Sequence, residues 1–268
     1  RPAPVRELLP VSFRPALETT LIQRESECMN SIEELYDPRI ARSRKLIAEA
    51  AILRRLLDER IQPALLERFL IEYCSLGVQI TEPVESWIRR AGERTTAIGL
   101  ASTGAALCDH ARHEADHHLM FIEDTQKLVA HWNTRHAQKL DAAALIARPP
   151  TPGMKHYIQL HEDTIASDQP FAQVAIELEV ERLSVTVLPS LLSQFRRVLG
   201  DDVMNSLSFL GSHAALDVGH THINSRMLST LLTQRPDAAA DLARIGAEAM
   251  FIYIAFFEEC YDAALAAV

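Results

Sequence analysis

The segment Ser208–Arg226, SFLGSHAALDVGHTHINSR, places two histidines and an aspartate at helical spacing. His213, Asp217 and His220 are four and then three residues apart. At about 100° per residue, their side chains fall within an arc of about 60° on one face of an α-helix. Two imidazoles and a carboxylate directed at one point are typical ligands of iron and other first-row metals. The segment therefore predicts a helix that contributes to a metal site.

A second histidine-rich segment, HARHEADHH, lies about a hundred residues earlier, from His110 to His118. Glu114 and His117 form an ExxH pair, one turn apart if the segment is a helix. This spacing lets a carboxylate and an imidazole of one helix bind the same ion, as in di-iron helical bundles. His110 and His113 project in a similar direction and are candidates for further ligands or supporting partners, whereas His118 points away.

A third segment, AIELEVERL, is apolar apart from its acids and Arg182. Glu177 and Glu181 lie one turn apart on one helical face, and Glu179 points elsewhere. A carboxylate buried among apolar side chains is unfavourable unless a partner compensates for it, and a metal ion is one such partner. An ion pair between Glu181 and the adjacent Arg182 is the ordinary alternative.

Each motif alone has a common explanation. A histidine in a helix is usually a hydrogen-bonded core or surface residue, and ExxH occurs often by chance. HxxxDxxH is rarer. The combination of ExxH, a glutamate in an apolar helix and HxxxDxxH supplies three histidines and three carboxylates, which is enough for two metal ions with open positions.

Composition favours a single all-α domain with a substantial core. The chain has 268 residues, of which 48% are hydrophobic, only 6% are aromatic and nine are glycines. Apolar residues repeat every three to four positions, which is typical of helices rather than strands. We expect one long helix over Arg94–Trp132, with Gly99 and Gly104 as points of bending or close packing, and another from Asp201 to about Leu232.

Charge and cysteine content favour a cytoplasmic protein without nucleic-acid or membrane partners. The net charge is −9, from 27 basic and 36 acidic residues, and no basic stripe is present. No apolar run approaches the ~18 residues of a membrane span, and no signal peptide is recognisable. The cysteines, which lack a CxxC pair, are expected to be buried thiols of a reducing compartment: Cys28, Cys74, Cys108 and Cys260.

With these motifs the chain resembles the heme-oxygenase-like di-iron oxidases and oxygenases. That family has Glu and His on one core helix, Glu on another, and His-x3-Asp-x2-His on a third. The resemblance implies these metal ligands: Glu114, His117, Glu181, His213, Asp217 and His220. The stretch VERLSVTVLPSLLSQFRRVLG also resembles the family's stretch after its central Glu, which favours Glu181 over Glu177.

The resemblance further implies a heme-oxygenase-like bundle of about seven core helices over residues 62–268, with residues 1–61 as an N-terminal helical extension. It implies two Fe2+ ions, with Glu114 as the bridging ligand, and O2 as co-substrate. Similar enzymes N-oxygenate amines or cleave carbon–carbon bonds of amino acids and fatty acids. The substrate would be a small organic molecule, and an external reductant is a further candidate partner.

Two other functions stay open. A TenA- or PqqC-like hydrolase or oxidase would use the same fold without a metal, and a helical module that binds a ligand or partner would perform no catalysis. The TenA-type hydrolases use a cysteine nucleophile, for which Cys74 and Cys108 have no recognisable setting. A homodimer would suit the apolar face of the last helix, although that face is also explained as core.

Overall fold

The computed structural model describes residues 31–268, and Cys28 lies outside this part. Every regular element in the described residues is a helix, which confirms the all-α prediction. The α-helices are α2 (Asp37–Ala48), α3 (Ala51–Leu56), α4 (Pro63–Thr81), α5 (Val84–Ala97), α6 (Ala101–His113), α7 (His117–Arg135), α8 (Ala142–Ile146), α9 (Pro152–Ala166), α10 (Gln173–Leu199), α11 (Asp201–Met204), α12 (Ser208–Gln234) and α13 (Ala239–Leu265). Short π- or 3-10-helical turns are η2 (Ile32–Tyr36), η3 (Pro170–Ala172) and η4 (Pro236–Ala238).

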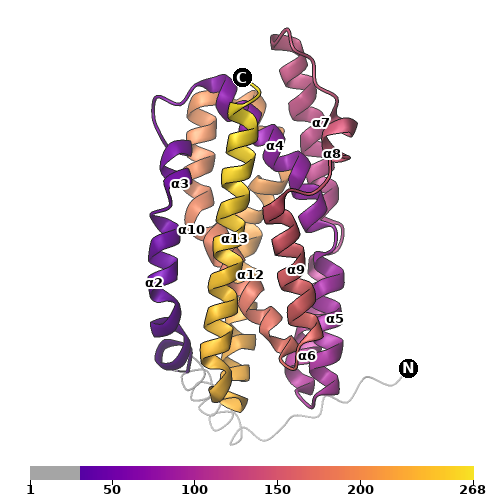
Figure 1. The fold of residues 1–268 in the computed structure, drawn as a ribbon, viewed down its shortest axis with the longest axis vertical. Coiled ribbons are helices and arrows are strands. Elements are labelled where there is room, and N and C mark those ends of the chain that lie inside the picture. The colour runs from indigo at the N-terminus through magenta and orange to yellow at the C-terminus, as the bar shows by residue number, and fades with distance from the viewer. Residues whose placement is uncertain (1–30) are drawn as a thin grey trace, which may run out of the picture.

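The helices form a bundle in which α10, α12 and α13 run along the long axis (Figure 1). Helices α2 and α3 lie on one side of α13, and α9, α5 and α6 lie on the other. Helix α13 packs against α10, α4, α2 and α9, and therefore occupies the middle of the bundle. Eight helices of 13 or more residues follow Gln62, against the seven or so expected.

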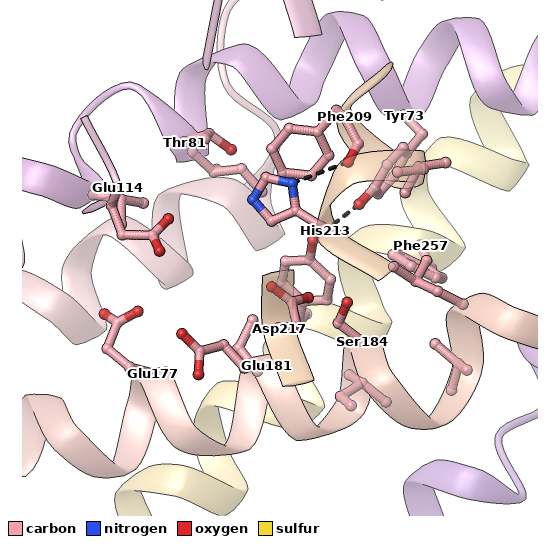
Figure 2. Close-up of a pocket in the computed structure, with 18 of the residues that line it drawn as sticks. Tyr73, Thr81, Glu114, Glu177, Glu181, Ser184, Phe209, His213, Asp217 and Phe257 are labelled. Atoms are coloured by element: carbon pink, nitrogen blue, oxygen red, sulfur yellow. Dashed lines mark hydrogen bonds between the residues drawn. The ribbon is translucent and has the colours of Figure 1, made fainter. Parts of the chain in front are cut away.

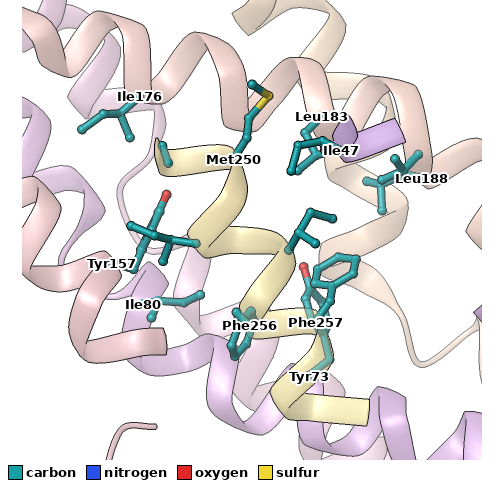
Figure 3. Packing of buried hydrophobic residues seen from close by; sticks show 14 of the residues in the cluster. Ile47, Tyr73, Ile80, Tyr157, Ile176, Leu183, Leu188, Met250, Phe256 and Phe257 are labelled. Atoms are coloured by element: carbon teal, nitrogen blue, oxygen red, sulfur yellow. The ribbon is translucent and has the colours of Figure 1, made fainter. Parts of the chain in front are cut away.

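The core of the bundle is built from aliphatic and aromatic side chains (Figure 3). The rings of Tyr73 in α4 and Phe257 in α13 meet edge to face, with centroids 5.2 Å apart. Phe256 packs against the same tyrosine at 5.7 Å. Such edge contacts add to the stabilisation that burial of the rings provides. They hold α13 against α4.

The long helix expected over Arg94–Trp132 is wrong, because the chain turns twice within it. The first turn separates α5 from α6 at Gly99, which has φ +94°, a conformation that glycine adopts without strain. The two helices then pack closely, and a Cβ on Gly104 would lie 2.5 Å from the carbonyl oxygen of Gly92. As predicted, the chain bends at Gly99 and packs closely at Gly104.

The second turn separates α6 from α7 at Asp116, whose φ is +65°. A left-handed residue ends a helix, and aspartate tolerates this region better than most side chains. Glu114 is consequently the residue that ends α6, and His117 is the first residue of α7. The spacing of the ExxH pair predicted that both residues lie on one helix, and this prediction is wrong.

The helix expected from Asp201 is also divided, into α11 and α12. Asp124 of α7 accepts hydrogen bonds from the backbone N–H of Ser208 and of Phe209, both at 2.9 Å, and from the Ser208 hydroxyl at 2.6 Å. These contacts satisfy N–H groups that the first turn of a helix leaves free. Helix α12 therefore begins at Ser208 because α7 supplies its cap.

The N-terminal part that the structure describes, η2, α2 and α3, packs against α13. A division of the chain at residue 61 stays a prediction. Among the described helices, none is long and apolar enough to cross a lipid bilayer.

Candidate metal centre

Four helices and one helix break surround the candidate metal centre. They supply His110 from α6, Glu114 from the break after it, His117 from α7, Glu181 from α10, and His213, Asp217 and His220 from α12. In the described structure all of these side chains except Asp217 make two groups of donor atoms that share one residue.

The first group contains His110, Glu114, Glu181 and His220, with donor atoms within 4.8 Å of one another. The Nδ1 atom of His220 lies 3.0 Å from Glu114 Oε1 and 3.6 Å from Glu181 Oε1. The Nε2 atom of His110 lies 3.4 Å from Glu181 Oε1. Two imidazoles and two carboxylates can thus hold one ion.

The second group contains Glu114, His117 and His213. His117 Nδ1 lies 2.9 Å from Glu114 Oε2. His213 Nδ1 lies 3.0 Å from the carbonyl oxygen of Phe209, a position where only an N–H can bond. This contact fixes the ring's tautomer and leaves the Nε2 lone pair of His213 available to a metal.

Glu114 joins the two groups, because Oε1 faces His220 and Oε2 faces His117. Burial alone would raise the pKa of Glu114, but the neighbouring imidazoles of His117 and His220 outweigh burial, so the pKa is lowered. Glu114 is therefore ionised, which is the form of a carboxyl group that can bind a cation.

Asp217 belongs to neither group. It is buried and lines the same pocket, beside Ser184 (Figure 2), and burial raises its pKa to about 6. Its assignment as a ligand stays a prediction.

Of the two candidate glutamates on α10, Glu181 is the one in a donor group. Asn224 donates to Glu181 Oε2 at 2.6 Å and orients that carboxyl group. Arg182, the expected alternative partner of Glu181, instead lies 3.5 Å from Glu179 and 3.7 Å from Asp37. Glu177 receives a hydrogen bond from Gln173 Nε2 to Oε1 at 2.5 Å.

His110 has a larger part in the site than the sequence motifs assigned to it. It is 1% exposed, and neither ring nitrogen makes a hydrogen bond within the described residues. Burial lowers its pKa, so the ring is neutral and has a free lone pair. His113, the other candidate, is exposed, and its ring stacks near that of His220 at 6.0 Å. In the sequence, the position of His110 one turn before Glu114 is the feature that indicates its place in the site.

The residues present fit a pair of metal ions. Burial lowers the pKa of His213 to about 4, and burial raises the pKa of Glu181. Neutral imidazoles are ready to bind a cation, and carboxyl groups that burial keeps protonated release their protons when a cation replaces them. The unbonded nitrogens of His110 would otherwise be costly in a protein interior.

A cavity of about 100 Å³ adjoins these donors (Figure 2). Its walls include Val187, Leu188, Leu210 and Phe257, together with Glu114, Glu181, His213 and Asp217. The cavity thus has an apolar part and a polar part, and the polar part contains the candidate ligands together with Glu177 and Ser184.

No family model and no curated protein matches this chain. Solved structures do. A domain of unknown function with a heme oxygenase-like fold from Shewanella denitrificans aligns with a TM-score of 0.62, covering 84% of this chain and 90% of that one at 14% identity. A TenA homolog from Pseudomonas syringae pv. tomato aligns with a TM-score of 0.65, covering 86% and 92%, also at 14% identity.

The fold is heme-oxygenase-like. This confirms the fold class predicted from the resemblance. At 14% identity the likeness of these heme-oxygenase-like structures concerns the fold alone, so the function must be argued from the side chains of the site.

Proposed function

We propose that this chain is a non-heme di-iron enzyme that uses O2 to oxidise a small organic molecule. The observation that supports this most directly is Glu114, whose two oxygens face two different groups of histidines. A carboxylate shared between two donor groups is a feature of di-iron sites in helical bundles.

We assign the ligands from the donor groups. His110, Glu181 and His220 would hold one Fe2+ ion and His117 and His213 the other, with Glu114 between them. Asp217, within one turn of both histidines of α12, is proposed as a further ligand. The two ferrous ions would supply the electrons that reduce O2.

The protein's own contribution is to orient the ligands and to exclude water. Asn224 holds Glu181, and the Phe209 carbonyl holds His213 in the tautomer that can ligate. The apolar cavity walls keep the reacting centre dry, which protects a reactive oxidant from side reactions.

The reaction we propose is either N-oxygenation of an amine or oxidative C–C cleavage of a molecule of amino-acid or fatty-acid type. An external reductant, a cytoplasmic location and a homodimer remain parts of the proposal.

The test is to load metal-free protein anaerobically with Fe2+, count bound iron, and then mix with O2 while recording the visible spectrum and oxygen consumption. We expect about two irons per chain and a transient absorbing species. Glu114→Ala and His220→Ala should lose both. His222→Ala is the matched control, because His222 is exposed on the same helix, and it should keep both. Folded protein that binds no iron would contradict the proposal.

The cysteine-dependent alternative has less support. None of the described cysteines lines the cavity. Burial raises the pKa of both Cys74 and Cys108, which disfavours the thiolate that a nucleophile requires. Oxygen-independent activity that survives Glu114→Ala would favour this alternative.

A further inference from the structure

Glu177 is an acid of the cavity that neither donor group uses. It is 8% exposed and lines the cavity wall. Gln173 donates to Oε1, whereas no hydrogen bond or ion pair to Oε2 occurs within the described residues. Figure 2 shows this carboxyl group on the same side of the cavity as those of Glu114 and Glu181.

Glu177 has no permanent cation beside it in the cavity, because none of the described lining residues is Lys or Arg. Burial raises the pKa of Glu177 to about 8, only partly offset by His110, so the carboxyl group is ionised above that pH or when a cation binds beside it. Glu179, two residues later on α10, faces the other way and is held by Arg44 at 2.6 and 2.8 Å. The protein thus neutralises one buried glutamate and leaves its neighbour for another partner.

An aromatic ring lines the same cavity as this carboxyl group. Tyr157 is among the lining residues, and after burial the charge of Glu177 is the largest influence that raises the pKa of Tyr157. A carboxylate beside an aromatic ring is a favourable setting for an organic cation, which gains an ion pair and a cation–π contact together.

The cavity changes character along α10. Glu177, Glu181, Ser184 and Leu188 follow one another on one helical face and all line it. Eleven residues of helix span about 16 Å. The end at Leu188, with Val187 and Leu210, is apolar, and the candidate ligand Glu181 lies between the two ends.

We propose that the cavity binds a primary alkyl ammonium, with its charged nitrogen on Glu177 and its aliphatic chain extending past the metal ligands toward Leu188. This names the substrate class of the oxidase proposed above and rests on that function for its chemistry. When Glu177 is ionised, a carboxylate at the same end would meet its charge without a neutralising lysine or arginine.

The test is calorimetric titration of the folded, metal-free protein at about pH 9, where Glu177 is ionised and an alkylamine still carries its proton. Three probes of equal length are used: n-hexylamine, hexanoate and 1-hexanol. Hexylamine should bind at least about tenfold more tightly than either other probe, the worth of one charge-assisted hydrogen bond. Glu177→Gln should reduce hexylamine to the affinity of hexanol and leave hexanol unchanged. Glu123→Gln, which removes an exposed acid of α7, should keep the preference. Leu188→Phe should weaken the binding of all three probes, because the larger ring fills the apolar end of the cavity.

The titrations are repeated with Fe2+-loaded protein under anaerobic conditions. An unchanged amine preference in Glu177→Gln, absence of hexylamine binding, or preference for hexanoate would each overturn the inference. A lower iron count in Glu177→Gln would also overturn it, because Glu177 would then be a ligand. Amine selectivity without iron uptake would defeat only the proposed function. Iron uptake and oxygen consumption without amine selectivity would defeat only this inference.

Discussion

Buried acidic side chains in this bundle face different kinds of partner, as Glu72 and the acids of the candidate metal centre show. In α4, Glu72 is fully buried between two guanidinium groups, 2.5 Å from Arg68 and 2.6 Å from Arg148. In the candidate metal centre, Glu114 and Glu181 face histidines and each other. The acids are of one residue type and are similarly enclosed, but only one group has permanent positive charges beside it.

The difference separates a structural site from a candidate functional one. Arginine stays charged at all ordinary pH values, so Glu72 is neutralised permanently and its position is useful only to the fold. Histidine can be neutral and can offer a lone pair, so the pocket can accept a cation from outside. The absence of arginine among the described pocket residues is therefore as informative as the presence of carboxylates.

The largest loss of stability is expected when the structural acid Glu72 is removed. Glu72→Ala leaves Arg68 and Arg148 without their partner in the interior and should lower the free energy of unfolding by about 3–5 kcal/mol. The loss should be the same with and without Fe2+. Urea denaturation measures it. Glu85→Ala, which breaks a partly exposed pair with Arg89, is the control and should cost less than about 1 kcal/mol. Equal losses in the two variants would remove the distinction.

A smaller effect is expected at the pocket. Glu181→Gln exchanges one uncharged side chain for another in metal-free protein, because burial raises the pKa of Glu181, so the free energy of unfolding should change by less than about 1 kcal/mol. The stabilisation by metal, about 2.7 kcal/mol at a hundredfold excess over Kd, should disappear. Calorimetric melting with and without Fe2+ tests both statements. Full metal stabilisation in the variant would show that Glu181 is not a ligand.

The smallest effect is a pH dependence of metal-free protein. Burial lowers the pKa of His213 to about 4 from 6.5. Above pH 6.5 this ring is therefore mostly neutral in both the folded and the unfolded chain, and it adds little to the pH dependence of stability. Burial raises the pKa of Glu177 to about 8 from 4.5, so the unfolded chain binds fewer protons than the folded one between these values. The contribution of Glu177 to stability should therefore fall by about 1–2 kcal/mol as pH rises from 6.5 to 8. Melting temperatures of wild type and Glu177→Gln across this range test it, and equal slopes would contradict it.

Residue spacing predicted the candidate site best where the residues lie within one regular helix. His213 and His220 share a face of α12 because a period of 3.6 residues places them there, and the structure brings both into donor groups. The ExxH pair also meets, but for a different reason, since the chain breaks at Asp116 and folds His117 back toward Glu114.

The remaining features depend on contacts between distant segments. Asp124 decides where α12 begins from 84 residues away, and nothing near Ser208 in the sequence indicates it. Asn224 holds Glu181 across 43 residues. Local pattern can propose which side chains are ligands, but it cannot show which tertiary partners orient them.

The bond between Phe209 and His213 has an evolutionary consequence. The carbonyl that orients His213 is backbone, and the ring of the same residue forms part of the cavity wall. That ring also stacks on the imidazole of His213, with centroids 3.8 Å apart. An exchange of the side chain at position 209 would therefore keep the backbone acceptor but change both the cavity shape and the packing of the histidine, so the two cannot diverge independently at this residue.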